Sequence, residues 1–246
     1  LLVVLVAAVV ALTGSISAKA ADVSAGADVA TAYVFRGATV NDGWVVQPDL
    51  SVSNSDSAEW LQPLTLGIWA NFDIEDSTGG NPESGQFSEI DLYGSYGLPL
   101  NVEDVDMAVG YTEYTYPSAA SEDTDADREI NLITSFDTLL SPEVAIYWGV
   151  DGNLDKTLEF QLTGSHDVPL NADEDLLLNL GGTVSYRVND NSGPENDDGF
   201  DYVLLSAGLS YNLFVARADF WIETDDKVQP IDGDEVVGVF GIGGDL

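Results

Sequence analysis

Two arginines and a set of acidic residues carry the strongest potential chemistry in this sequence. Arg36 and Arg187 are two of only 7 basic residues, against 43 acidic ones, and each falls at a polar position of a stretch that alternates apolar and polar residues. Carboxylates occupy comparable polar positions, namely Asp28, Asp49, Glu89, Asp91 and Glu159. Facing one interior, these groups would either pair with one another and fill it, or form a constriction that selects solutes by charge.

Catalytic chemistry is expected to be absent. His166 is the only histidine, and Ser165 precedes it. Consecutive side chains of a strand point to opposite faces, so the two residues cannot act as a nucleophile and its base. By parity, His166 shares the face of Leu158, Phe160 and Leu162. The sequence also contains no phosphate-binding loop and no dinucleotide fingerprint, so we expect neither an enzyme nor a cofactor.

Clusters of acidic residues raise the question of a hard cation such as calcium. The segment 151–155 begins like a calcium loop, but Lys156 stands where that loop requires glycine, and Leu162 where it requires glutamate. Further acidic clusters are Asp123, Asp125 and Asp127, and Asp232, Asp234 and Glu235. Acidic surface loops are more often simply solvated, so the sequence predicts no specific metal site and leaves calcium open.

The overall charge excludes several classes of partner. The formal net charge is −36, and phosphate recognition needs lysine and arginine, so nucleic acid is not expected as a partner. A peripheral helix on anionic lipid is excluded for the same reason. The acidity fits either solubility in a salty habitat or a vestibule that attracts cations. Because there is no cysteine, disulfides and thiolate metal sites are impossible.

The N-terminal segment has the layout of a secretory signal peptide. Residues 1–12 are almost wholly aliphatic, and the small-x-small triplet Ala18-Lys19-Ala20 follows. The apolar run is shorter than the roughly 20 residues of a spanning helix. We therefore predict a signal peptide over 1–20, truncated at its start because no methionine or basic leader precedes it, and a single domain over 21–246.

The rest of the chain must position the charged groups, and its dominant pattern has a period of two. The third stretch is the clearest, because Leu64, Leu66, Ile68, Ala70 and Phe72 alternate with polar or small residues. The alternating stretches are 23–35, 46–53, 64–73, 89–96, 105–112, 129–136, 144–150, 158–163, 176–188, 203–211, 214–222 and 236–242. Long acidic loops separate several of them, at 74–86, 117–128, 189–199 and 224–234.

This pattern predicts an all-β fold, an antiparallel transmembrane β-barrel of about 12 strands with short periplasmic turns and longer acidic outer loops. Aromatic residues near the predicted strand ends, among them Tyr33, Phe35 and Trp60, fit the girdles at a membrane interface. A secreted soluble β-sandwich is the alternative architecture, since its strands also alternate.

Several short motifs resemble the TorF-type porin family of Gram-negative bacteria. They are Tyr33-Val-Phe-Arg-Gly37, then Gln47-Pro48, Leu66-Gly-Ile-Trp-Ala70 and Glu89-Ile-Asp-Leu-Tyr93, in this order over about the first hundred residues. The resemblance implies an outer-membrane barrel that acts as a pore, without a known substrate. We therefore expect passive diffusion of small solutes, cations included, through the outer membrane. The alternatives are a non-conducting structural or adhesion barrel and the soluble sandwich.

Overall fold

The computed structural model describes residues 22–54, 64–78, 82–100, 102–119, 125–189, 198–223 and 234–245. The predicted signal peptide, residues 1–20, and Trp60 lie outside these ranges. The described residues form strands and one 3-10 turn, η1 (Gly152–Leu154). In these ranges, no helix is long and apolar enough to cross a membrane.

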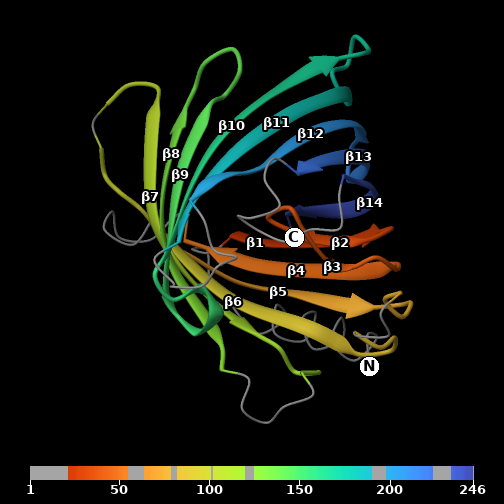
Figure 1. Ribbon diagram of the computed structural model, residues 1–246. Coiled ribbons are helices and arrows are strands. Elements are labelled where there is room, and N and C mark those ends of the chain that lie inside the picture. Colours follow the sequence, from red (N-terminus) through yellow and green to blue (C-terminus); the bar gives the residue numbers. More distant parts are fainter. Residues whose placement is uncertain are drawn as a thin grey trace.

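Twelve antiparallel strands close into one barrel, which confirms the predicted fold class (Figure 1). Each strand pairs with its two neighbours, and β1 pairs with both β14 and β4 to close the wall. A sheet that closes on itself has no second sheet to pack against, so the sandwich alternative is wrong. The wall strands are β1 (Asp22–Ala30), β4 (Val45–Ser53), β5 (Leu64–Asp73), β6 (Phe87–Gly97), β7 (Val105–Thr115), β8 (Asp127–Phe136), β9 (Glu143–Asp151), β10 (Thr157–Pro169), β11 (Leu176–Asn189), β12 (Gly199–Tyr211), β13 (Phe214–Glu223) and β14 (Glu235–Asp245).

The antiparallel order assigns every connection to one of two ends of the barrel. The segments 31–44, 74–86, 116–126, 152–156, 190–198 and 224–234 join strands at one end, here called the loop end. The segments 54–63, 98–104, 137–142, 170–175 and 212–213 join strands at the other, the turn end, where β1 also begins. The loop end carries most of the long connections, as predicted, although 152–156 is short there and 54–63 is long at the turn end.

Alternate residues of each strand expose large apolar side chains on the outside of the wall. Examples are Leu66 at 57% exposure, Trp148 at 56% and Phe240 at 55%. Exposed large apolar side chains lie on nearly every strand of the wall, as a barrel facing lipid requires. The opposite parity faces the lumen and carries most of the polar groups.

A second, two-stranded sheet lies inside the barrel. It consists of β2 (Tyr33–Phe35) and β3 (Ala38–Asn41), in the segment between β1 and β4. The prediction of one strand over 23–35, with Tyr33 and Phe35 in an outer aromatic girdle, is therefore wrong. The chain leaves the wall after Ala30, and Tyr33 becomes 95% buried because its hydroxyl finds a carboxylate partner in the lumen.

The apolar packing inside the barrel lies where this hairpin meets the wall. The core cluster contains Ala30, Ala32, Tyr33, Val45, Val237 and Val239, with Val34, Phe35, Trp69 and Trp221 against it. The ring of Tyr33 packs on Trp69 with centroids 5.4 Å apart, and Phe35 meets Tyr114 edge-on at 5.5 Å. The hairpin is thus held to the inner wall by packing as well as by polar contacts.

Candidate functional site

The tip of the hairpin places an arginine at a tight turn. Phe35 pairs with Ala38, so the turn consists of Arg36 and Gly37, whose φ angles are 49° and 85°. Two positive φ angles are typical of a type I′ turn, which prefers asparagine followed by glycine. Gly37 also lies close to Tyr202, because a Cβ built on it would come within 2.9 Å of the Tyr202 Cβ.

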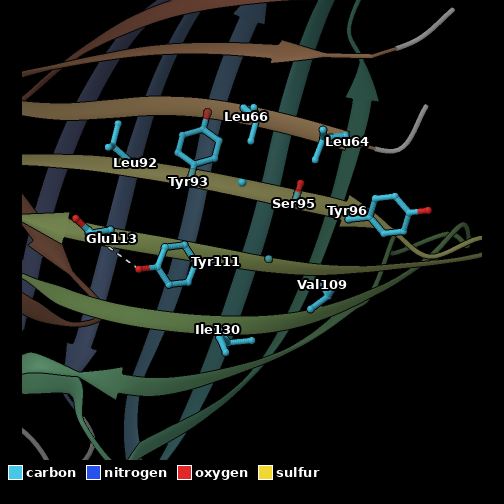
Figure 2. A pocket seen from close by; sticks show the side chains of 12 residues that line it. Leu64, Leu66, Leu92, Tyr93, Ser95, Tyr96, Val109, Tyr111, Glu113 and Ile130 are labelled. Carbon is cyan, nitrogen blue, oxygen red and sulfur yellow. Dashed lines mark hydrogen bonds between the residues drawn. The ribbon is translucent and has the colours of Figure 1, made fainter. Parts of the chain in front are cut away.

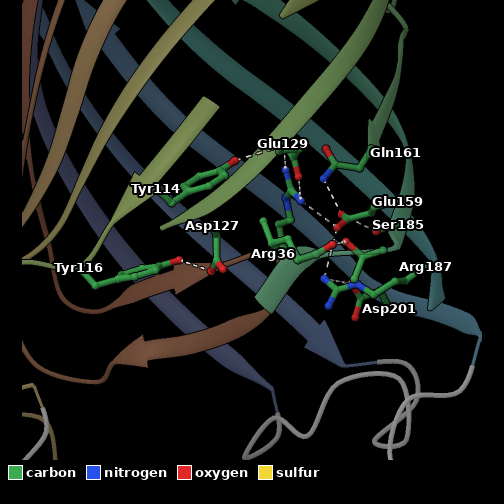
Figure 3. A network of polar contacts seen from close by, with 12 residues as sticks. Arg36, Tyr114, Tyr116, Asp127, Glu129, Glu159, Gln161, Ser185, Arg187 and Asp201 are labelled. Atoms are coloured by element: carbon green, nitrogen blue, oxygen red, sulfur yellow. Dashed lines mark hydrogen bonds and ion pairs between the residues drawn. The ribbon is translucent and has the colours of Figure 1, made fainter. Parts of the chain in front are cut away.

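The Arg36 side chain reaches across the lumen to two wall strands (Figure 3). Its Nη1 and Nη2 donate to the two carboxylate oxygens of Glu129, on β8, at 2.7 and 2.8 Å. Nη1 also lies 3.4 Å from Oε2 of Glu159, on β10. The guanidinium lies over the rings of Tyr147 and Phe35, with distances to their centroids of 4.2 and 4.9 Å. The bidentate geometry and the aromatic faces suit arginine and would not suit lysine.

A second arginine continues the network along the wall. Nη2 of Arg187, on β11, lies 3.3 Å from Oε2 of Glu159 and 2.7 Å from Oδ2 of Asp201, on β12. The Arg187–Asp201 contact has the distance of an ion pair without the angles of a hydrogen bond. Glu159 also accepts hydrogen bonds from Ser185 and Gln161, at 2.8 and 2.7 Å. Two arginines therefore share three carboxylates, with Glu159 between them.

Other lumen carboxylates bind tyrosines and amides. The Tyr33 hydroxyl donates to Glu89 at 2.9 Å, and Tyr116 donates to Asp127 at 2.7 Å. Asp91, on β6 beside Glu89, is 8% exposed, and its Oδ1 has no hydrogen-bond partner. These groups add carboxyls to the loop-end half of the lumen without adding a cation.

The return strand of the hairpin is anchored by a buried amide network. Asn41 donates to Oδ1 of Asp73 at 2.8 Å, and Asn71 donates to the same oxygen at 3.0 Å. All three side chains have no exposed surface. At the rim, Asp42 accepts from Thr78, and these hydrogen bonds hold the pKa of the Asp42 carboxyl below its ordinary value.

Buried acids outnumber buried or half-buried bases around the hairpin. The carboxylates that are less than one-tenth exposed are Asp73, Glu89, Asp91, Asp127, Glu129, Glu159, Asp201 and Asp219, here called the acid belt. Arg36 and Arg187 face the belt, and Arg217 pairs with Asp219 at 2.8 Å. Three arginines against eight carboxylates leave this half of the lumen strongly negative wherever the acids are ionised.

The predicted site residues divide between the two halves of the lumen. Arg36, Arg187 and Glu159 form one network, whereas Glu89 and Asp91 lie in the acid belt without contacting either arginine. Asp28 and Asp49 lie together in another part of the lumen, and their predicted role beside the arginines stays a prediction. Asp49 accepts from Tyr93 at 2.8 Å. With Asp28, Gln47 and Trp69 it lines a cavity of about 310 Å³.

Glu129, Asp219 and Asp201 belong to this site but were not among the predicted site residues. Glu129 and Asp219 occupy polar positions of recognised stretches, so their parity could have identified them. Asp201 could not be found in this way, because the predicted strand began at position 203, whereas β12 begins at Gly199. A register shift between Val184 and Tyr186 then changes the parity at the start of β12, which buries Asp201 at 1% exposure.

The remaining candidates for chemistry have structural roles or stand apart. His166 is exposed and pairs with the outward-facing Leu180. Asp151 caps η1 by accepting from the Gly152 amide at 3.0 Å and pairs with Arg128. Asp123 and Asp232 lie outside the described residues. In the part of the chain that the structure describes, no three acidic or histidine side chains are placed to hold a metal ion.

A hollow on the wall lies apart from the lumen network (Figure 2). It has a volume of about 670 Å³ and lies over β5 to β8, where Gly94 leaves a gap among Leu66, Leu92 and Tyr111. The large apolar lining residues have the parity of the outer surface, so lipid chains would meet this hollow. It contains none of the predicted site residues.

Solvent access differs between the two halves of the lumen. The acid belt and the amide network at the loop end are almost completely buried, with Glu129 at 1% and Asp73 at 0%. Farther from the loop end, inward-facing side chains such as Asp49 and Thr65 are only partly buried. The hairpin therefore fills the loop-end half of the lumen, and the side chains beyond it are less tightly packed.

Sequence comparison connects the chain to one family. A family model described as "Bacterial protein of unknown function (Gcw_chp)" matches residues 15–237. No curated protein matches the chain. The resemblance to TorF-type porins stays a prediction.

Solved barrels resemble the chain in fold at low sequence identity. One membrane protein, from a study of in-meso crystallization, is 10% identical with a TM-score of 0.50, and the alignment covers 92% of this chain and 84% of that one. The NanC porin is 10% identical over 91% of this chain and 97% of its own, with a TM-score of 0.45. Outer membrane phospholipase A from Escherichia coli is 13% identical over 90% and 91%, with a TM-score of 0.46. No function is transferred from these likenesses.

Proposed function

The chain belongs to the Gcw_chp family of bacterial proteins, and we propose that it forms a porin-like barrel in the outer membrane of a Gram-negative bacterium. The apolar outer surface supports a position in lipid, because exposed leucines and aromatics on nearly every strand would be unfavourable in water. The proposed role is passive diffusion of small solutes, with cations favoured over anions. Lipid is then the surrounding partner, and the net charge of −36 argues against nucleic acid.

The observation that carries this proposal is the excess of carboxylates over arginines in the acid belt. Charges that line a narrow passage with low-dielectric walls act on ions far more strongly than charges on an open surface. Further inward acids, among them Asp28, Asp49 and Glu143, are only partly buried. A cation entering from the turn end would therefore pass these carboxylates before it reaches the acid belt.

We propose a non-enzymatic role for the same lumen. Ser165 and His166 are consecutive in β10 and point to opposite sides of the wall. Most carboxylates of the acid belt contact arginines, tyrosines or amides, which supports structural or electrostatic roles. A purified barrel that cleaves ester-linked lipids, with the activity lost in His166→Ala, would contradict this.

Ion selectivity in planar bilayers tests the proposal. Under a potassium chloride gradient, the reversal potential should show cation preference, and the double variant Asp28→Asn/Asp49→Asn should reduce that preference. The matched control Asp173→Asn/Glu174→Gln removes the same charge from the exposed turn 170–175 and should leave the preference nearly unchanged. A clear preference for anions in the wild-type protein would overturn the proposal.

A non-conducting structural or adhesion barrel is the second candidate, because the hairpin closes the loop end. Absence of conductance from the wild-type protein and from a variant that lacks the hairpin would favour it. Conductance of the wild-type protein would exclude a lumen that is permanently sealed. Conductance of the variant alone would show that the hairpin seals the wild-type lumen.

A further inference from the structure

Resting on the passive diffusion proposed above, we infer that the β2–β3 hairpin is a gate and that Arg36 is the residue that keeps it closed and limits cation passage. In this closed state the guanidinium is a tethered cation that occupies the acid belt. Free cations would have to pass the same carboxylates. Arg36 therefore controls both the opening of the lumen and its selectivity.

The backbone at the hairpin tip supports a special role for this arginine. A type I′ turn favours asparagine at the position of Arg36, and a positive φ of 49° is unfavourable for a long side chain. The turn alone therefore does not explain the residue. The contacts of its side chain with Glu129 and Glu159 do, since together they hold a strained backbone conformation in place.

The hairpin is separable from the wall that surrounds it. Ala30, the last residue of β1, pairs directly with Val45, the first residue of β4. The two strands are thus neighbours in the sheet without the intervening segment 31–44, and a two-residue turn would be sufficient to join them. An insertion of this length inside the lumen, at a place where the wall needs only a turn, is the arrangement of a plug.

The contacts of Arg36 with Glu129 and Glu159, here called the latch, lie at the end of the hairpin that is farthest from its attachment to the wall. Arg36 contacts β8 and β10, whereas β2 and β3 join the wall at β1 and β4. Figure 3 shows the guanidinium between Glu129 and Glu159, with Tyr114 beside Glu129. Loss of these tip contacts would release the tip of the hairpin at Arg36, while Tyr33 with Glu89 and Asn41 with Asp73 still hold its base. The exposed carboxylates would then line an open passage.

The variant Arg36→Asn is the sharpest test, because asparagine-glycine is a preferred sequence for this turn. It removes the charge and the reach of the side chain while keeping the turn. Loss of a buried bidentate pair shifts a two-state equilibrium by about 100-fold or more, so single-channel recordings should show a rise in open fraction of that order or to saturation. Cation preference should rise as well. Arg128→Asn is the matched control, since Arg128 pairs with Glu113 and Asp151 outside the lumen, and it should behave as the wild type.

A second variant, in which Asn-Gly replaces residues 31–44, removes the plug itself and should give the largest conductance. Heat-modifiable migration on gels confirms that each variant is a folded barrel. The gate is supported if conductance is lowest in the wild type, higher in Arg36→Asn and highest in the variant with the hairpin replaced. If Arg36→Asn equals the wild type and only the replacement conducts more, the latch is overturned. If all three conduct alike, the gate is overturned and the proposed diffusion stands. If none conducts, the proposed diffusion itself fails.

Discussion

The ion pair between Arg36 and Glu129 should contribute strongly to the stability of the folded barrel. Its side chains are only 10% and 1% exposed, and two hydrogen bonds of 2.7 and 2.8 Å join them. Removal of one partner from such a pair leaves a buried, uncompensated charge at a cost of about 3–5 kcal/mol. We expect Arg36→Asn and Glu129→Gln each to lower the free energy of unfolding by about 3 kcal/mol, near the lower end of this range. The loss stays near this end because Tyr114 and Glu159 remain as alternative partners.

A double-mutant cycle measures this coupling. Reversible urea unfolding in lipid vesicles, followed by gel migration, gives the free energy of unfolding of each variant. The double variant should lose about 2–3 kcal/mol less than the sum of the single losses, since neither charge is then left alone. The exposed pair Arg128–Glu113, with both side chains about one-third exposed, is the matched control and should couple by no more than about 1 kcal/mol. Additive single losses at Arg36 and Glu129, within about 0.5 kcal/mol, would refute this reasoning.

Three further predictions concern the wall and the rim. Gly149→Val should prevent the β9–β10 connection from forming, because a Cβ there would overlap the backbone oxygen of Leu154. Gly164→Ala, whose Cβ would have its nearest neighbour at 3.7 Å, should fold normally, and gel migration distinguishes the two variants. Leu205→Arg, on the outer face in the middle of β12, should cost about 2–4 kcal/mol of folding free energy in vesicles, whereas Ser206→Arg on the lumen face should cost clearly less; equal losses would contradict the assigned faces. The hydrogen bonds of Asp42 with Thr78, which lower the pKa of the Asp42 carboxyl, should stabilise the rim at pH values above the ordinary pKa of aspartate. This stabilisation should be lost as the pH falls through the lowered pKa. A carboxyl titration by NMR that finds an ordinary or raised pKa for Asp42 would rule this out.

The wall of the barrel was predictable from the sequence, whereas the hairpin was not. Strict alternation specifies a two-faced strand, and stretches such as 64–73 match β5 closely. The same alternation wrongly predicted that Tyr33 and Phe35 belong to a wall strand, because residues still alternate with a period of two in a strand that has left the wall. Only long-range contacts, such as Tyr33 with Glu89, decide which side of the wall the segment occupies, and no local pattern reports them.

The charged site was predictable in composition and only partly in arrangement. Parity placed Arg187 and Glu159 on the lumen side, since the period of two is preserved along regular strands. Arg36 lies in the lumen for a different reason, because the hairpin that carries it leaves the wall. Their pairing depends on how far each strand is shifted against its neighbour, which a single sequence does not specify. Asp201 shows the limit, because a bulge changes the parity of one strand locally.

The inserted hairpin also bears on the order in which the barrel assembles. Its tip binds Glu129, 93 residues away in sequence, and Thr31 at its base accepts from the Gly238 amide, 207 residues away. Contacts of such separation can form only after most of the chain has been incorporated. The hairpin therefore docks late, onto a wall that is already curved, and acts as an internal strut joining β1 and β4 to the opposite side. A barrel without this strut would be expected to keep its hydrogen-bonded wall but lose resistance to flattening.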